Sequence, residues 1–306
     1  MKNRPLKKRI KYTLLYYFIR FLIFFSNLMP RKVWLAFCGW LGKLAYSFSP
    51  KPRERTIHHL GLAFSGERNT RQILDLSKKV FVMLGKNAGD ILRSLRVKKL
   101  ADLEKFLVTH GLENYEKAHA KGKGVMFLTS HVGAFDLQVT NMALRGLNPN
   151  IIGTALKDER LNELLFEYRN AFGAIAIERG KESVRLFKVL KAGGSIAILI
   201  DQDTKVKSRF VDFFGMKAAT PIGATVLALR TGCAVVPTYI YLGEDGKQHM
   251  HILPEIPLVI TGDEENDLIV NTQSFTNMTE KIVREHPEQW VWMHERWKTK
   301  PGQEIR

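Results

Sequence analysis

The sequence predicts an α/β protein with a central mixed sheet flanked by helices, and two observations support this fold class. Between residue 125 and about residue 256, short apolar runs of strand length alternate with longer segments of helical periodicity. Such alternation is typical of a layered α/β fold. In addition, 306 residues with 45% hydrophobic residues are enough to bury a substantial core, and this composition argues against disorder.

The expected strands and helices alternate along the chain, because each short apolar run is bounded by glycine or by a polar segment of helical pattern. Strands are expected at 125–130, 150–156, 174–179, 195–201, 234–242 and 249–256. Helices are expected at 70–95, 137–146, 158–173, 181–194, 220–232 and 266–285. The proline-rich, basic residues 49–56 are expected to be a connector.

The charge balance predicts an anionic partner. The chain carries 47 Lys+Arg against 30 Asp+Glu, a formal net charge of +17. This excess favours nucleic acid, an acidic membrane surface, a phosphorylated substrate or an acidic protein. No nucleic-acid recognition motif is present, and a nucleic-acid-binding function leaves the amino terminus unexplained. The two cysteines, Cys38 and Cys233, are expected to be buried thiols, and no Cys/His cluster indicates zinc.

The amino terminus favours a membrane among these partners. Six Lys or Arg residues occupy the first eleven positions, and residues 12–30 follow with Arg20 as their single charge. No small-residue cleavage site follows, which argues against a signal peptide. A span of this length is near the minimum, and a central arginine costs a few kcal/mol on insertion scales. We therefore expect a helix that lies in the membrane interface or dips into it, with a second apolar stretch at 33–48 packed beside it.

This interpretation divides the chain into two parts. Residues 1–48 are expected to form a basic and hydrophobic membrane-anchoring segment, and residues 49–306 a catalytic domain. The cationic block predicts that both face the cytoplasm.

The most suggestive candidate for chemistry is "SHVGAFD", in which His131 follows an apolar run and Asp136 comes five residues later. Functional groups in α/β sheets gather at the carboxyl ends of strands. Five residues apart on one helix, the two side chains would point about 140° apart. With His131 on the turn and Asp136 in the first helical turn, the carboxylate can accept a hydrogen bond from the imidazole and leave the other nitrogen as a base.

The pattern His-x-x-x-x-Asp is weak by itself, since a lone histidine often only caps a turn. No Gly-x-Ser-x-Gly nucleophile motif is present. A working dyad would therefore activate a hydroxyl of the substrate, which is acyl transfer by direct attack. A metal-dependent hydrolase that uses His131, Asp136, Asp201 and Asp203 is the alternative, because paired carboxylates can bind Mg²⁺.

Several motifs in order resemble one family. "SHVGAFD" is similar to the His-x-x-x-x-Asp/Glu block of the lysophospholipid and glycerolipid acyltransferases. The other motifs resemble the late acyltransferases of lipid A biosynthesis, the Kdo-dependent lauroyl/myristoyl transferases. They are "NELLFEYRNAFGAIAIER", "LKAGGSIAILIDQD" with "RFVDFFGMKAATPIGATVLA", "VVPTYIY" and "HPEQWVWMHERWKTKPG". The resemblance runs from the hydrophobic amino terminus to about residue 302.

The resemblance implies a glycerolipid acyltransferase-like fold and an O-acyltransferase without cofactor or metal. The donor would be acyl carrier protein, or sometimes acyl-CoA. The acceptor would be a hydroxyl of a phosphorylated acylated glucosamine lipid, at the cytoplasmic face of a Gram-negative inner membrane. Some relatives serve other acceptors, so a glycerophospholipid or another glycolipid is the alternative.

The resemblance also assigns roles to residues. His131 and Asp136 would be the catalytic dyad. Arg169 and Arg179 fall at the arginine positions of the second block, and a guanidinium can clamp a phosphate with two hydrogen bonds. We expect the carboxylates Asp201 and Asp203 to anchor active-site arginines. Arg296 belongs to the carboxyl-terminal motif that would contact an anionic acceptor, although the sequence has Glu295 in front of it, where the motif usually has a paired arginine.

Overall fold

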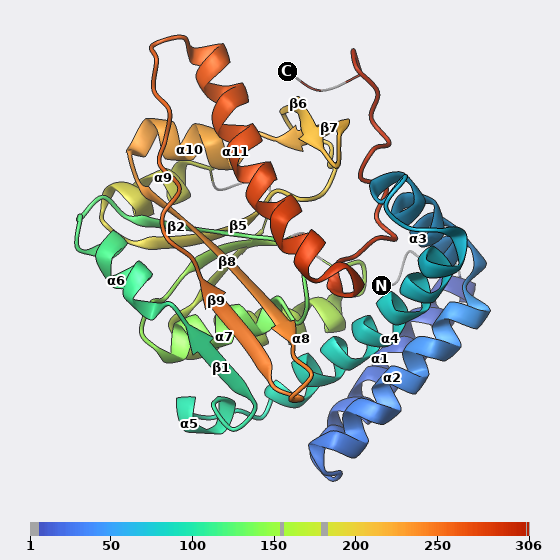
Figure 1. Cartoon of the computed structure of the whole chain (residues 1–306). Helices are drawn as coiled ribbons and strands as arrows, with labels where there is room; N and C mark the ends of the chain where they lie inside the picture. The colour runs from blue at the N-terminus through green and yellow to red at the C-terminus, as the bar shows by residue number, and fades with distance from the viewer. Residues whose placement is uncertain (1–5, 154–155, 179–182, 304, 306) are drawn as a thin grey trace.

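A computed structural model describes residues 6–153, 156–178, 183–303 and 305 of the chain. Its centre is a seven-stranded mixed sheet with helices on both faces (Figure 1). The strand order is β1-β9-β8-β2-β5-β3-β4. The pair β8–β9 is antiparallel and all the other neighbours are parallel. The predicted α/β fold with a mixed, helix-flanked sheet is therefore confirmed.

The strands of this sheet are β1 (Leu107–His110), β2 (Val125–Thr129), β3 (Asn150–Gly153), β4 (Ile175–Glu178), β5 (Ser195–Leu199), β8 (Ala234–Leu242) and β9 (Gln248–Ile252). All six predicted strands are present. The prediction missed β1, which is only four residues long. It also missed a separate hairpin of β6 (Ser208–Phe213) and β7 (Met216–Pro221).

The two faces of the sheet carry two parts of the core, because side chains alternate along each strand. Val125 and Phe127 of β2 pack on the face covered by α6 (Leu112–His119) and α7 (Asp136–Leu144). Met126 and Leu128 pack on the opposite face, which is covered by α9 (Ser183–Lys191), α10 (Gly223–Thr231) and α11 (Glu264–Glu285). All five residues of β2 are buried, as expected for the central strand of a sheet covered on both faces.

The first four helices lie together beside the sheet (Figure 1). They are α1 (Leu6–Ser26), α2 (Arg31–Phe48), α3 (Pro50–Ala63) and α4 (Thr70–Ser94). The remaining helices are α5 (Leu100–Leu103), α8 (Glu159–Asn170) and the short 3-10 turns Ala171–Gly173 and Pro287–Gln289. The helix α3 replaces the connector expected at 49–56. Its prolines lie in the first turn, where the helix has no use for a backbone N–H, so they start this helix instead of breaking it.

Small residues bring α2 and α4 into close contact. A Cβ on Gly42 would lie 2.1 Å from the carbonyl oxygen of Phe81, and one on Gly85 would lie 2.2 Å from that of Cys38. Only glycine allows the two backbones to approach this far. Both cysteines are buried free thiols, as predicted.

The helix α1 falls where the sequence predicted the hydrophobic amino-terminal helix. Within the described ranges, however, none of the helices is long and apolar enough to cross a bilayer. The basic residues at the start of α1 and the central Arg20 lower its hydropathy. The structure therefore shows a helix where the sequence predicted one.

Candidate active site

The loop between β2 and α7 presents His131 at the carboxyl edge of the sheet. Gly133 in this loop has φ +61°, and a Cβ there would lie 2.1 Å from the carbonyl oxygen of Ile240. The left-handed backbone and the close approach both require glycine. The N–H of Gly133 donates to the carbonyl of Gln289 at 2.9 Å, and Val132 forms a β-bridge with Trp290. The carboxyl-terminal motif thus fixes the loop that carries His131.

His131 is held by Asp201, which lies in the same position after the neighbouring strand. Strands β2 and β5 pair in parallel with Thr129 opposite Leu199, so His131 and Asp201 each lie two residues beyond a paired position. The imidazole Nδ1 lies 2.8 Å from Oδ1 of Asp201, and the backbone N–H of His131 donates to Oδ2 at 2.9 Å. These two contacts fix both the ring and the backbone of His131 against one carboxylate.

A third donor completes the surroundings of Asp201. The indole Nε1 of Trp290, a fully buried residue, donates to Oδ2 at 2.8 Å. Burial by itself raises the pKa of Asp201, but the charge of His131 and the three hydrogen bonds lower it to about 2. Asp201 is therefore a stable carboxylate in the interior of the protein.

The same pair sets the protonation of the histidine. Burial lowers the pKa of His131, whereas the negative charge of Asp201 and the hydrogen bond to it raise the pKa, and the net direction is upward. A histidine whose Nδ1 is bound to a carboxylate keeps Nε2 available to accept a proton. The ring also packs edge-to-face on Phe135, with centroids 4.8 Å apart.

The predicted hydrogen bond between His131 and Asp136 needs correction, because each residue has another partner. Asp136 is the first residue of α7, and its Oδ1 accepts from Arg169 of α8, with Nε at 2.8 Å and Nη2 at 2.7 Å. Tyr168 also donates to the carbonyl of Asp136, at 3.4 Å. Asp136 still acts on His131 through its charge, which helps to raise the histidine pKa.

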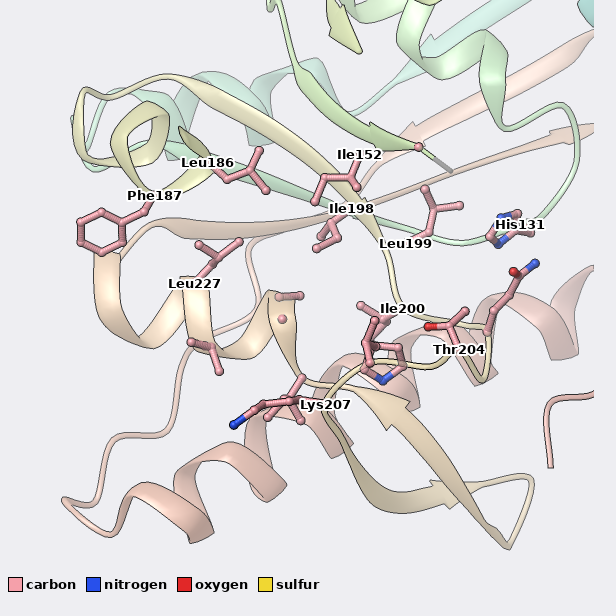
Figure 2. Close-up of a pocket in the computed structure, with 18 of the residues that line it drawn as sticks. His131, Ile152, Leu186, Phe187, Ile198, Leu199, Ile200, Thr204, Lys207 and Leu227 are labelled. Atoms are coloured by element: carbon pink, nitrogen blue, oxygen red, sulfur yellow. The ribbon is translucent and has the colours of Figure 1, made fainter. Parts of the chain in front are cut away.

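A pocket of about 900 Å³ begins at His131. Figure 2 shows His131 at one end and Phe187 of α9 at the other, with side chains of β3, β5 and α10 between them. The lining is predominantly apolar and includes Ile152, Ile198, Ile200, Leu186, Phe187 and Leu227. Arg169 lines the pocket near His131, and Lys207 and Arg230 are exposed cations on its wall. This shape suits a long aliphatic chain whose polar end lies at the histidine.

The other residues that the sequence predicted for the site have other partners or lie outside the described residues. Asp203 accepts from the N–H and the hydroxyl of Thr299, both at 2.9 Å, so it holds the carboxyl-terminal segment. The hydrogen-bond partners of Asp201 and Asp203 are thus not arginines, although the charges of both carboxylates act to raise the pKa of the buried Arg296 against the larger, lowering effect of burial. Arg179 lies outside the described residues. Among the described residues, no group of three His, Cys, Asp or Glu side chains is arranged to hold a metal ion.

Arg296 lies in the interior, where it is 1% exposed. It donates to the carbonyl of Ala219 at 2.7 Å and to the hydroxyl of Thr220. The buried position of Arg296 therefore does not support the expected contact with an anionic acceptor. Its hydrogen bonds instead connect the carboxyl-terminal segment to β7. Glu295 pairs with Arg55 of α3 at 3.0 Å on the surface.

Sequence reasoning missed the roles of Asp201 and Trp290. The available signal was that the apolar runs ending in His131 and Asp201 both place a polar residue directly after a strand. Trp290 belongs to a buried aromatic cluster with Trp292, Phe213 and Phe214, and this cluster lies outside the pocket.

A histidine bound to a buried carboxylate at the head of a long apolar pocket is compatible with an enzyme that acts on an acyl chain. Comparison with known proteins gives the class and the family. Residues 2–299 match the family model "Bacterial lipid A biosynthesis acyltransferase". The chain belongs to this family and is an acyltransferase.

Individual relatives are similar over most of the chain. A "Lipid A biosynthesis acyltransferase" of Haemophilus influenzae is 27% identical over 87% of this chain and 81% of its own length. The "Lipid A biosynthesis lauroyltransferase" of Escherichia coli is 26% identical over 86% of this chain and 84% of its own. A "Phosphatidylinositol mannoside acyltransferase" of Mycobacterium tuberculosis is 23% identical over 62% of this chain and 60% of its own.

Proposed function

We propose that this protein transfers a fatty acyl chain from a carrier thioester to a hydroxyl of a phosphorylated acylated glucosamine lipid, a precursor of lipid A. The observation that carries this proposal is the position of His131, bound to Asp201 through Nδ1 at the head of the apolar pocket. The family membership supports the acyl transfer and the names of the relatives support the acceptor.

In the proposed reaction, Nε2 of His131 takes the proton of the acceptor hydroxyl as its oxygen attacks the thioester carbonyl. The new C–O bond forms, the C–S bond breaks, and the proton passes from the imidazole to the leaving thiolate. Asp201 keeps the tautomer of His131 and stabilises the imidazolium that forms. Ser130, the adjacent hydroxyl, is 1% exposed, which supports an acceptor hydroxyl instead of a protein nucleophile.

We assign different tasks to the two carboxylates. Asp201 is the direct partner of His131, and Asp136 adds negative charge nearby and orients Arg169. Arg169 faces the pocket beside His131, so we propose that it contacts an anionic group of a substrate. Arg179 is expected to bind phosphate on the resemblance alone.

We further propose that residues 1–48 dock on the cytoplasmic face of the inner membrane, with residues 49–306 as the catalytic domain. The support is the apolar surface of α1 and α2. Its exposed side chains include Leu14, Tyr17, Phe18, Phe21, Val33 and Trp40. Aromatic rings beside cations suit the interface of an anionic membrane, where each Lys or Arg adds about 1 kcal/mol.

Mass spectrometry of lipid A from cells that lack this protein tests the reaction. We expect lipid A with one acyl chain fewer, and restoration of that chain by the wild-type gene. An unchanged lipid A profile would refute the lipid A assignment. Transfer assays with acyl carrier protein and acyl-CoA thioesters, side by side, identify the donor.

One alternative acceptor has an observation in its favour. The similarity to the mycobacterial mannoside acyltransferase allows a different glycolipid acceptor. Transfer to such a lipid, with no change in lipid A, would support this alternative. The metal-dependent hydrolase alternative gains no support from the two carboxylates, because the oxygens of Asp201 and Asp203 accept hydrogen bonds from protein donors.

A further inference from the structure

A second cavity of about 410 Å³ lies between α1, the end of α4 and α8. Its volume is within the usual range of ligand pockets, about 300–1,000 Å³. The helix α8 separates it from the active-site pocket: Leu165 and Arg169 line the active-site pocket, and Leu164 and Tyr168 line the second cavity. A ligand in the second cavity would therefore contact the side of α8 that faces away from the active site, and Arg169 on the other side of α8 binds Asp136.

The charges in this cavity favour an anion. Arg20, the one charged residue in the apolar segment 12–30, lines it together with Arg96. Across the described part of the chain, neither guanidinium takes part in a hydrogen bond or ion pair. Glu167 is the acidic residue of the lining, so two positive charges meet one negative charge. Guanidinium groups bind phosphate with paired hydrogen bonds.

The apolar part of the cavity indicates that the anion carries a hydrocarbon chain. Ile23 and Phe24 of α1 face Leu164 and Phe172 across the cavity. Phe172 has φ +63°, a left-handed conformation that is costly for a bulky residue and often marks a functional position. Phe172 is 39% exposed, so this backbone keeps a large apolar residue at the cavity instead of in the core.

The cavity also lies at the helix that we propose to dock on the membrane. The helix α1 is attached to α8 by Arg160, whose guanidinium lies 4.6 Å from the ring centroid of Tyr16 and whose Nη2 donates to Thr13 at 3.3 Å. Phe18 and Phe21, on the exposed side of α1, would meet the bilayer. A lipid can then reach the cavity with its phosphate at the arginines and its chains still in the membrane.

We propose that this second cavity binds an anionic glycerophospholipid of the bilayer as a non-substrate ligand. Arg20 and Arg96 hold the phosphate, and the upper part of an acyl chain packs against Phe24 and Phe172. Tyr168, which lines the cavity, donates to the carbonyl of Asp136, so the bound lipid braces the wall of the active site. The proposal rests on the membrane-docking part of the proposed function and not on the acyl-transfer chemistry.

The test measures lipid binding directly and does not depend on turnover. The full chain in neutral detergent is mixed with phosphatidylglycerol or phosphatidylcholine, and retained lipid is counted by native mass spectrometry. We expect one phosphatidylglycerol per chain. We expect the double variant Arg20→Gln/Arg96→Gln to weaken retention about ten-fold or more, since it removes charge-assisted hydrogen bonds. The matched control Lys8→Gln/Lys11→Gln removes two cations from α1 outside the cavity and should retain the lipid.

Equal retention by the two double variants, equal retention of phosphatidylcholine, or no retained lipid would overturn the proposal. A second variant, Leu164→Trp, fills the cavity and leaves both arginines in place. It should also lose the lipid, so the proposal does not depend on the folding of the arginine variant. Inorganic phosphate in excess should not displace the lipid; displacement would show a plain anion site.

Discussion

Histidines at two places in this protein occupy opposite environments. At the carboxyl edge of β2, His131 lies against the buried carboxylate of Asp201, and its pKa is raised. At the end of the sheet formed by β1, β9 and β8, His249 and His251 stack with tyrosines of β8, and His110 stacks with both of these histidines. His251 stacks on Tyr239 with centroids 4.9 Å apart, and its pKa is lowered to about 4.

The difference shows what makes a histidine useful as a base. Burial lowers the pKa in both places. Around His251, the neighbouring histidines His110, His249 and His286 lower it further. At His131 a single carboxylate reverses the direction. The nearby charge, and not the burial, therefore separates a candidate base from a packed aromatic ring.

The largest effect is expected from removal of the base itself. His131→Ala should lower kcat by about 10²–10⁴-fold, the usual contribution of general acid–base catalysis. Initial rates of acyl transfer, measured in detergent so that membrane binding plays no part, check this. The exposed His58→Ala is the control and should keep full activity. Near wild-type turnover of His131→Ala would contradict the assigned mechanism.

The next largest effect is expected at Asp201. Asp201→Asn keeps the size of the side chain but removes the charge that stabilises the imidazolium, so kcat should fall by about 10²-fold. Loss of a buried charge can also affect folding. The control is therefore the circular dichroism spectrum of the variant, which must match that of the wild type. An Asp201→Asn protein with unchanged kcat would show that the contact with His131 serves only the fold.

Trp290 should matter less, because it acts through Asp201. Trp290→Phe removes the indole donor to Oδ2, and a hydrogen bond to a charged group contributes about 1.5–3 kcal/mol. We expect kcat to fall about ten-fold while KM changes little. Trp292→Phe is the matched control, since its indole donates to the carbonyl of Pro287 and not to Asp201. Equal losses of kcat in both variants would indicate a packing effect only.

The last expected effect concerns stability instead of catalysis, and it lies at His251 in the cluster with His110 and His249. The folded pKa of His251, about 4, is below its unfolded value, so unfolding takes up a proton between pH 6.5 and 4. The stability that this group contributes is complete above pH 6.5 and is lost as the pH falls toward 4. It amounts to at most about 3 kcal/mol.

His251→Phe keeps the stacked ring and removes the titration. The variant should therefore lose less stability than the wild type between pH 6.5 and 4, which urea unfolding at several pH values measures. Identical pH dependence in the two proteins would show that His251 does not titrate in this range.

The sequence could predict features that depend on local patterning, but not those that depend on which strands pair. The alternation of apolar runs and helical segments predicted the fold class and six strands, because local patterning decides these features. His131 could be selected because it directly follows an apolar run. Its partner could not be identified, because a spacing of five residues is visible in the sequence and the pairing of β2 with β5, which brings Asp201 into register 70 residues later, is not.

Other positions needed tertiary structure as well. Nothing in "HERWK" distinguishes a buried arginine from an exposed one, and only the packing of the carboxyl-terminal segment against β7 places Arg296 inside. In the same way, prolines at 50 and 52 indicate a connector until their position at the start of a helix is known.

In the proposed mechanism Asp201, and not Asp136, is the carboxylate that sets the protonation of His131. The pH dependence of kcat/KM for Asp201→Asn and Asp136→Asn tests it most directly, because the acid limb reports the pKa of the free enzyme's base. Since Asp201 raises the pKa of His131 more than Asp136 does, Asp201→Asn should move the acid limb to clearly lower pH and Asp136→Asn should move it less. An acid limb that moves with Asp136→Asn and stays in place with Asp201→Asn would contradict the claim.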